Sequence, residues 1–108
     1  MITDKEKEVI YACIKHWTDN IHSKFLSGYK AYAGYPPRWQ DGSFIKCTVY
    51  SCPMCKEYLY KDKNCNRCLF VRILGVKCSE TGGRNFVENP TLETCLIFMN
   101  NFDKFLRS

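Results

Sequence analysis

Apolar residues recur every three or four positions near the start of the chain, from Thr3 to about Phe25. This spacing predicts a long amphipathic helix with one apolar stripe. Thr3 and Glu6 fit a capping box at its start, and Gly28 is a candidate stop signal. The predicted stripe consists of Ile10, Cys13, Ile14, Trp17, Ile21 and Phe25.

A second amphipathic helix is predicted at the other end of the chain, with Asn89 as its N-cap and Pro90 as its first residue. Residues 79–90 in front of it are expected to form a loop, because turn-forming residues dominate that stretch. Residues 69–78 fit either a strand or a buried helix. The apolar side of the second helix is expected to hold Leu92, Cys95, Leu96, Met99, Phe102 and Leu106.

Between the helices, residues 28–46 break the periodic pattern with three glycines, two prolines and five aromatic rings. Pro36 and Pro37 favour extended backbone around them. A flexible linker has more Ser and Gly and fewer rings, so this segment is expected to be an ordered loop.

Residues 52–68 read CPMCKEYLYKDKNCNRC and hold half of the eight cysteines. Cys52 pairs with Cys55 and Cys65 with Cys68 in two Cys-x-x-Cys motifs, separated by nine residues. Two such motifs can complete a tetrahedron of thiolates around zinc once a turn brings them together. The spacing predicts one structural zinc ion with these four ligands, and an iron–sulfur centre is the alternative metal.

The other four cysteines have separate interpretations. Cys13 and Cys95 lie on the predicted apolar stripes, where a cysteine is usually a small core residue. Cys78 is an alternative ligand of the same ion, and Cys47 is a second one. Cys13 and His16 share a helix face and could hold a second ion together with Cys47 or Cys78.

The start of the chain lacks the uninterrupted apolar stretch of a secretory signal, and no segment has the roughly 18 consecutive apolar residues of a membrane span. These features predict a cytoplasmic protein, where thiols stay reduced and cysteine pairs favour metal over disulfides. The formal charge is +5. Four thiolates with one divalent cation contribute −2, which leaves about +3 and a mildly basic surface.

Together, these patterns predict a mostly α single domain over residues 1–108, in which two amphipathic helices bracket a four-cysteine zinc site, with at most a short β-hairpin. Both histidines, His16 and His22, precede the cysteine window, and four thiolates can close a zinc site. A catalytic zinc keeps an open position. The sequence therefore predicts a binding protein, and a metal-dependent hydrolase or nuclease is the disfavoured alternative.

The order of His16-Trp17 on a helix, Cys52-x-x-Cys55-x-x-Tyr58, Cys65-x-x-Cys68 and a later Cys78 resembles small, mostly uncharacterised accessory proteins of tailed bacteriophages. Those proteins usually have Pro after the fourth cysteine, where this chain has Leu69, and usually end soon after the fifth. The resemblance implies a zinc-binding protein made in the host bacterial cytoplasm, in a class where inhibitors of host or defence proteins are common.

Two segments could bind a partner. The aromatic loop combines the residue types that anchor protein interfaces, and the predicted contact residues are Tyr29, Tyr32, Tyr35, Arg38 and Trp39. Some of these rings are alternatively part of the core. Residues 56–77 carry six cations against two acids, with Tyr58 and Tyr60 among them, so a nucleic-acid-binding module is the second hypothesis.

Overall fold

The computed structural model describes residues 2–47, 53–55, 57, 69–75 and 78–107. The first helical segment runs through α1 (Asp4–Trp17), a π-helical turn η1 (Thr18–His22) and α2 (Ser23–Leu26). The hydroxyl of Thr3 accepts from the N–H of Glu6 at 3.1 Å, and the N–H of Thr3 donates to the Glu6 carboxylate at 2.8 Å. The predicted helix and its capping box are confirmed.

The helix ends at Leu26, and Gly28 closes its last turn, in agreement with its role as a stop signal. The N–H of Gly28 donates to the carbonyl of Phe25, and the N–H of Tyr29 donates to the carbonyl of Lys24, both at 3.0 Å. These two hydrogen bonds form a Schellman motif, which needs a left-handed residue after the helix. Gly28 has φ of +92°, a conformation that costs glycine little because it has no Cβ.

The aromatic segment is ordered and contains a short antiparallel hairpin. Its strands are β1 (Ala31–Tyr32) and β2 (Arg38–Trp39), in which Ala31 pairs with Trp39 and Tyr32 with Arg38. A further bridge joins Arg38 to Phe44. The chain therefore crosses this small ribbon three times.

The described parts of the cysteine region and of the residues that follow it, up to Glu88, are mostly helical. They comprise α3 (Pro53–Cys55), the π-helical turn η4 (Phe70–Leu74), the 3₁₀ turn η5 (Cys78–Thr81) and α4 (Gly83–Glu88). For residues 69–75 the helical alternative is therefore correct. The expectation of a loop over residues 79–90 is wrong, because Phe86 is fully buried and its packing stabilises a helix despite the two glycines.

The last helix, α5, spans Leu92–Leu106, and its N-cap is Thr91. Thr91 and Thr94 form a reciprocal capping box, with the Thr91 hydroxyl accepting from the Thr94 N–H at 3.1 Å. The prediction of Asn89 as N-cap is wrong, since Asn89 instead ends α4. Its carbonyl accepts from the Thr94 hydroxyl at 2.8 Å, which fixes the short connection between the two helices.

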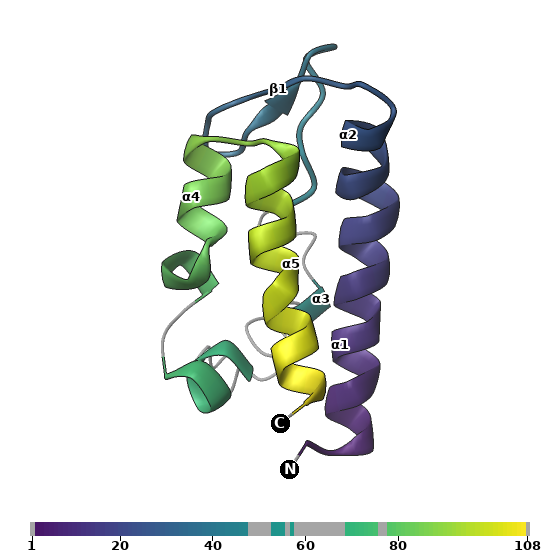
Figure 1. Ribbon diagram of the computed structural model, residues 1–108, viewed down its shortest axis with the longest axis vertical. Coiled ribbons are helices and arrows are strands. Elements are labelled where there is room, and N and C mark those ends of the chain that lie inside the picture. Colours follow the sequence, from purple (N-terminus) through teal and green to yellow (C-terminus); the bar gives the residue numbers. More distant parts are fainter. Residues whose placement is uncertain (1, 48–52, 56, 58–68, 76–77, 108) are drawn as a thin grey trace.

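The helices α1 and α5 run antiparallel beside one another, so both chain ends lie at the same end of the molecule (Figure 1). The helix α4 packs on α5 away from α1, and the hairpin lies at the opposite end from the termini. This arrangement confirms a mostly α fold. Among the described residues, no helix is long and apolar enough to span a bilayer.

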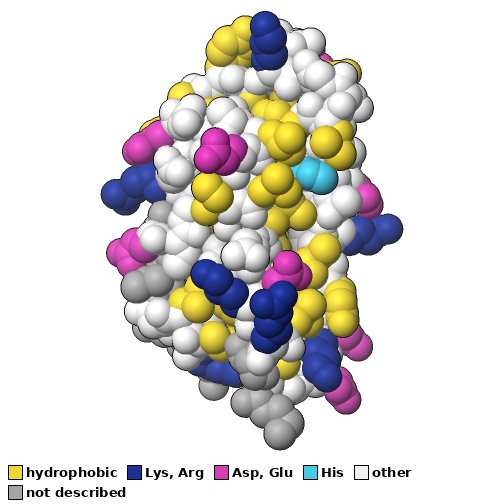
Figure 2. All heavy atoms as spheres, viewed as in Figure 1, with side chains coloured by type: hydrophobic (Ala, Val, Ile, Leu, Met, Phe, Trp, Pro, Cys, Tyr) yellow, Lys and Arg dark blue, Asp and Glu magenta, His cyan; other side chains and the backbone are white. Residues whose placement is uncertain are grey.

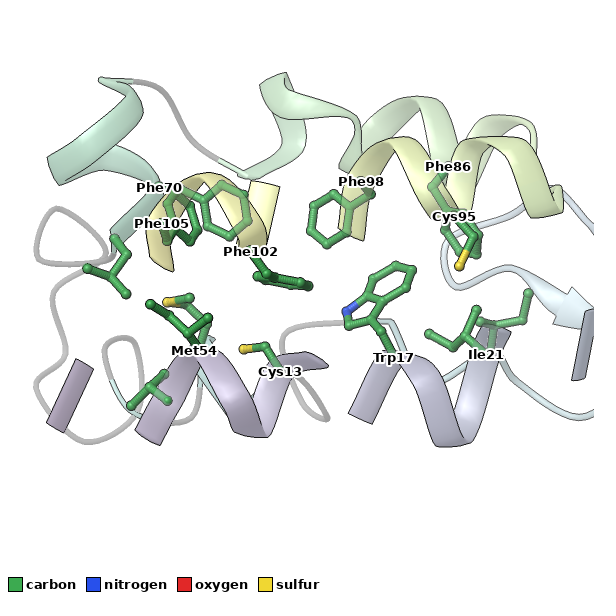
Figure 3. Close-up of a cluster of buried hydrophobic side chains, with 14 of the residues drawn as sticks. Cys13, Trp17, Ile21, Met54, Phe70, Phe86, Cys95, Phe98, Phe102 and Phe105 are labelled. Atoms are coloured by element: carbon green, nitrogen blue, oxygen red, sulfur yellow. The ribbon is translucent and has the colours of Figure 1, made fainter. Parts of the chain in front are cut away.

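Aromatic side chains dominate the core between these elements (Figure 3). The ring of Trp17 lies 4.7 Å from that of Phe98 and 5.1 Å from that of Phe86, centroid to centroid. Phe70 packs 4.9 Å from Phe105. The predicted stripe of the first helix is buried, except that Ile14 and Phe25 are half-buried.

The buried stripe of α5 differs from the predicted one. Cys95 and Phe102 are buried as expected, but Leu96 is 47% exposed and the remaining predicted positions are half-buried. Phe98 and Phe105 take their place in the core. Two apolar stripes overlap on this helix, and the one with larger rings is buried because it removes more apolar area from water.

Candidate functional site

The hairpin end of the molecule carries a group of exposed rings, which we call the aromatic end. Tyr35 is 76% exposed, Tyr32 60%, Phe44 54% and Tyr29 37%. The aromatic end consists of Leu26, the last residue of α2, and of Tyr29, Tyr32, Tyr35, Arg38 and Phe44 on the segment that follows it.

Trp39 is not part of this surface. It is 1% exposed, and its ring packs against those of Phe25 at 4.9 Å and Tyr29 at 6.0 Å. The ammonium of Lys24 lies 5.3 Å from the Trp39 ring. The prediction of Trp39 as a partner-binding residue is therefore corrected: its ring belongs to the core, because the hairpin turns alternate side chains to opposite faces.

Phe44 was not among the predicted contact residues, although a signal for it is present. Asp41-Gly42 is a hairpin dipeptide, and Gly42 has φ of +89°. The Asp41 carboxylate accepts from the Ser43 hydroxyl at 2.5 Å and from the Ser43 N–H at 2.9 Å, and these bonds lower its pKa. The turn reverses the chain so that Phe44 lies beside Arg38.

Hydrogen bonds to α4 and within the loop fix the loop in position. The N–H of Gly34 donates to the carbonyl of Val87 at 3.2 Å, and the N–H of Gln40 donates to the carbonyl of Lys30 at 2.8 Å. The Tyr35 hydroxyl donates to the Glu88 carboxylate at 2.9 Å, and this bond raises the pKa of Tyr35. The exposed rings therefore belong to a backbone that hydrogen bonds hold in place.

Most of the predicted zinc ligands lie outside the described residues. This applies to Cys52, Cys65 and Cys68, while for Cys55 the structure describes the backbone, in α3. Met54, inside the first motif, is 1% exposed, and Leu69 and Phe70, which follow the second motif, are 0% and 2% exposed. All three side chains belong to the same hydrophobic cluster. The first Cys-x-x-Cys motif therefore contains a residue that is buried in the same core as the residues that follow the second motif.

The four remaining cysteines lie in or near that core. Cys13 and Cys95 are fully buried, which agrees with their interpretation as core residues. The Cys95 thiol is 3.6 Å from the Met99 sulfur, and burial raises its pKa to about 12. Cys47 and Cys78 are half-buried against the cluster, and their participation in the zinc site stays a prediction.

His16 is engaged with the backbone of the aromatic segment. Its Nε2 lies 2.5 Å from the carbonyl oxygen of Lys46, and because a carbonyl only accepts, Nε2 carries the proton. Its Nδ1 lies 3.4 Å from the side-chain amide of Asn20. Within the described ranges, no group of three or more His, Cys, Asp or Glu side chains is placed to hold a metal ion. A second ion on Cys13 and His16, with Cys47 or Cys78, stays a prediction.

Comparison of the chain with protein-family models, with curated proteins and with solved structures found no match. The function is therefore inferred from the residues themselves.

A surface pocket of about 390 Å³ lies between η4, η5 and α5. Asn101 contributes one wall, and its amide donates to the carbonyls of Thr81 and Phe98, each at 2.9 Å. The lining residues that the structure describes include one cation but neither a carboxylate nor an imidazole. They are Leu74, Thr81, Ile97, Asn100, Asn101 and Lys104.

Exposed apolar side chains also occur on α5, where Leu96 and Ile97 are 47% and 51% exposed. Figure 2 shows apolar side chains along this face of the molecule, and a basic side chain beside apolar ones at the hairpin end. The α5 patch is aliphatic, whereas the aromatic end combines rings with cations. The aromatic end therefore has the composition of a protein-binding surface.

Proposed function

We propose that the protein is a non-enzymatic zinc-binding protein that binds another protein through its aromatic end. The observation that carries the proposal is the exposure of Tyr32, Tyr35 and Phe44 on a backbone held by hydrogen bonds. Clustered exposed rings mark interaction sites, because leaving them in water is unfavourable unless a partner covers them. Fixing them in advance lowers the entropy cost of binding.

In this proposal, one structural zinc ion is held by Cys52, Cys55, Cys65 and Cys68. Tetrahedral coordination by four thiolates is typical of structural zinc and leaves no position for a reacting water. The burial of Met54 within the first motif and of Leu69 after the second supports the proposal, since a cross-link between anchored segments stabilises the core they share. In this proposal the ion stabilises the helical core that carries the aromatic end.

The resemblance to small tailed-phage proteins suggests the class of partner. We propose a host or defence protein of the bacterial cytoplasm, whose surface is blocked by stoichiometric binding. Inhibition of this kind needs a rigid contact surface and no reacting group.

Affinity capture from a bacterial lysate tests the interface. We expect the wild-type protein to retain a specific partner, and the triple variant Tyr32→Ala, Tyr35→Ala, Phe44→Ala to lose it while keeping its circular dichroism spectrum. Tyr11→Ala is the matched control, because Tyr11 is 58% exposed but lies on α1. Equal retention by the triple variant and the wild type would contradict the proposed interface.

Nucleic-acid binding is the second candidate. The basic stretch predicted for it, residues 56–77, lies mostly outside the described residues, and the exposed rings and cations of the aromatic end are a further platform for stacked bases. The ammonium of Lys24 lies 5.6 Å from the Tyr29 ring, and the Arg38 guanidinium carbon lies 4.4 Å from the Phe44 ring. The salt dependence of binding distinguishes the two functions. Binding to phosphates weakens steeply between 50 and 200 mM salt, whereas binding through buried rings changes much less.

A further inference from the structure

The hairpin of the aromatic end has two different faces. Ala31 and Trp39 are cross-strand partners, and Trp39 is buried on the core side. Side chains alternate along a strand, so the next pair, Tyr32 and Arg38, lies on the opposite face. Phe44 pairs with Arg38 from the other side. We call Tyr32, Arg38 and Phe44 the outer row.

Arg38 is the central residue of the outer row. Its guanidinium carbon lies 4.4 Å from the Phe44 ring centroid, which restricts the side chain by a cation–π contact. Arg38 is exposed, and within the described part of the chain it has no ion pair with a carboxylate. A guanidinium held in this way offers a planar set of N–H donors that matches a carboxylate in a bidentate pair.

The segment that carries the outer row is positively charged, although one acid from outside it, Glu88, reaches the aromatic end, where its carboxylate accepts from the Tyr35 hydroxyl at 2.9 Å. The segment 24–46 carries the cations Lys24, Lys30, Arg38 and Lys46 against a single acid, Asp41, for a net charge of +3. The Asp41 carboxylate accepts two hydrogen bonds from Ser43 within its own turn. A positive surface of this kind attracts an acidic partner and raises its association rate.

We propose that the outer row binds an acidic segment of the partner protein, with a Glu or Asp carboxylate paired to Arg38 and neighbouring apolar side chains packed on Tyr32 and Phe44. The inference rests on the proposed function, because it requires that the aromatic end binds a protein. It favours a peptide over a nucleic acid because the row has one cation between two rings, whereas a phosphate backbone is tracked by a series of cations.

Panning of a random peptide display library on the purified full-length protein tests the inference. We expect the enriched peptides to share an Asp or Glu flanked by apolar residues. A synthetic copy of the best peptide then serves as the probe, and calorimetry gives its affinity for each variant.

Arg38→Lys and Arg38→Ala are each expected to lower the affinity for the probe about tenfold or more. Alanine removes the charge and the donors, whereas lysine keeps the charge but lacks the bidentate geometry. Replacing the probe's carboxylate by its amide should cause the same loss in the wild type and almost none in Arg38→Ala. Arg107→Ala is the matched control, since Arg107 is exposed beyond the end of α5, at the other end of the molecule. Thermal unfolding of each variant reports whether the fold is kept.

The outcomes separate the two levels of the hypothesis. If Tyr32→Ala and Phe44→Ala weaken the probe but Arg38→Ala does not, the acidic partner is wrong and the protein interface stands. If none of these changes weakens any enriched peptide, the proposed interface fails as well. Enrichment without acidic residues overturns the inference, and so does tighter binding of a single-stranded oligothymidine that depends on Arg38.

Discussion

Glu6 has two roles in the folded chain. It completes the capping box with Thr3, and its carboxylate forms an ion pair with Arg72 of η4, the turn that follows the cysteine window. Glu6 is only 5% exposed, and burial alone raises its pKa. Hydrogen bonds from Thr3 and Arg72 and the charge of Arg72 outweigh burial, so the pKa lies below its usual value.

We therefore predict a pH-dependent contribution of Glu6 to stability. Its ionised form is favoured in the folded state, so the contribution is complete above the pKa of the unfolded chain, about 4.3, and is lost as pH falls through the lower folded pKa. Glu6→Gln should lower the free energy of unfolding by about 1–2 kcal/mol at pH 7, since Arg72 stays partly solvated. Urea unfolding at pH 7 and at lower pH measures the difference.

Glu8→Gln is the control for this prediction, because Glu8 is exposed and only 3.9 Å from Lys5 in a surface pair. Its effect should stay within about 0.5 kcal/mol. A constant difference between Glu6→Gln and the wild type down to pH 3 would show that the ion pair does not stabilise the fold.

At the scale of elements, the hairpin divides its aromatic residues between core and surface. Trp39 lies on the inner face, in contact with the rings of Phe25 and Tyr29. Phe44 lies on the outer face, where its described ring contact is with Arg38. The same short ribbon therefore closes the core and presents the outer row to solvent.

This division predicts opposite results for two similar substitutions. Trp39→Ala should lower the free energy of unfolding by about 3–5 kcal/mol, because it leaves a cavity in the packed core. It should reduce partner binding only by unfolding the hairpin. Phe44→Ala should cost less than about 1 kcal/mol, since the ring is half in water and loses one cation–π contact. Urea unfolding of both variants tests this. Equal stabilities would mean that Trp39 does not support the core.

At the scale of the whole molecule, the cysteine motifs and the core are coupled. Met54 in the first motif and Leu69 and Phe70 after the second are buried in the hydrophobic cluster to which α1 and α5 contribute. In the proposed site, loss of the metal would free both segments at once, and the core would lose these side chains. Metal binding and folding should therefore be one cooperative process.

We expect about one zinc ion per chain by elemental analysis, and loss of the fold on treatment with a strong chelator, because zinc binding in finger peptides contributes about 10–16 kcal/mol. Cys52→Ser and Cys65→Ser should have the same effect. Cys95→Ser is the control: its buried thiol contacts Met99, so the change should cost about 1–3 kcal/mol and leave the zinc content unchanged. Metal-free protein with oxidised cysteines would refute the zinc site.

The sequence by itself determined the local features. The capping box of Thr3 and Glu6, the stop at Gly28 and the apolar stripe of the first helix depend on residues within a few positions of one another, so their pattern predicts them correctly. The order of the aromatic segment was also predictable from its rings and prolines. The cysteine spacing predicts a zinc site, and that prediction awaits the metal analysis.

Only the tertiary structure decided which of several local options is used. α5 has two overlapping apolar stripes, and the packing of Trp17 against Phe98 selects one of them. Phe86 stabilises a helix in a stretch rich in turn residues, and the hairpin register places Trp39 inside and Arg38 outside. In each case the local preferences are nearly balanced, and burial of large rings from distant elements supplies the free-energy difference that the neighbouring residues cannot provide.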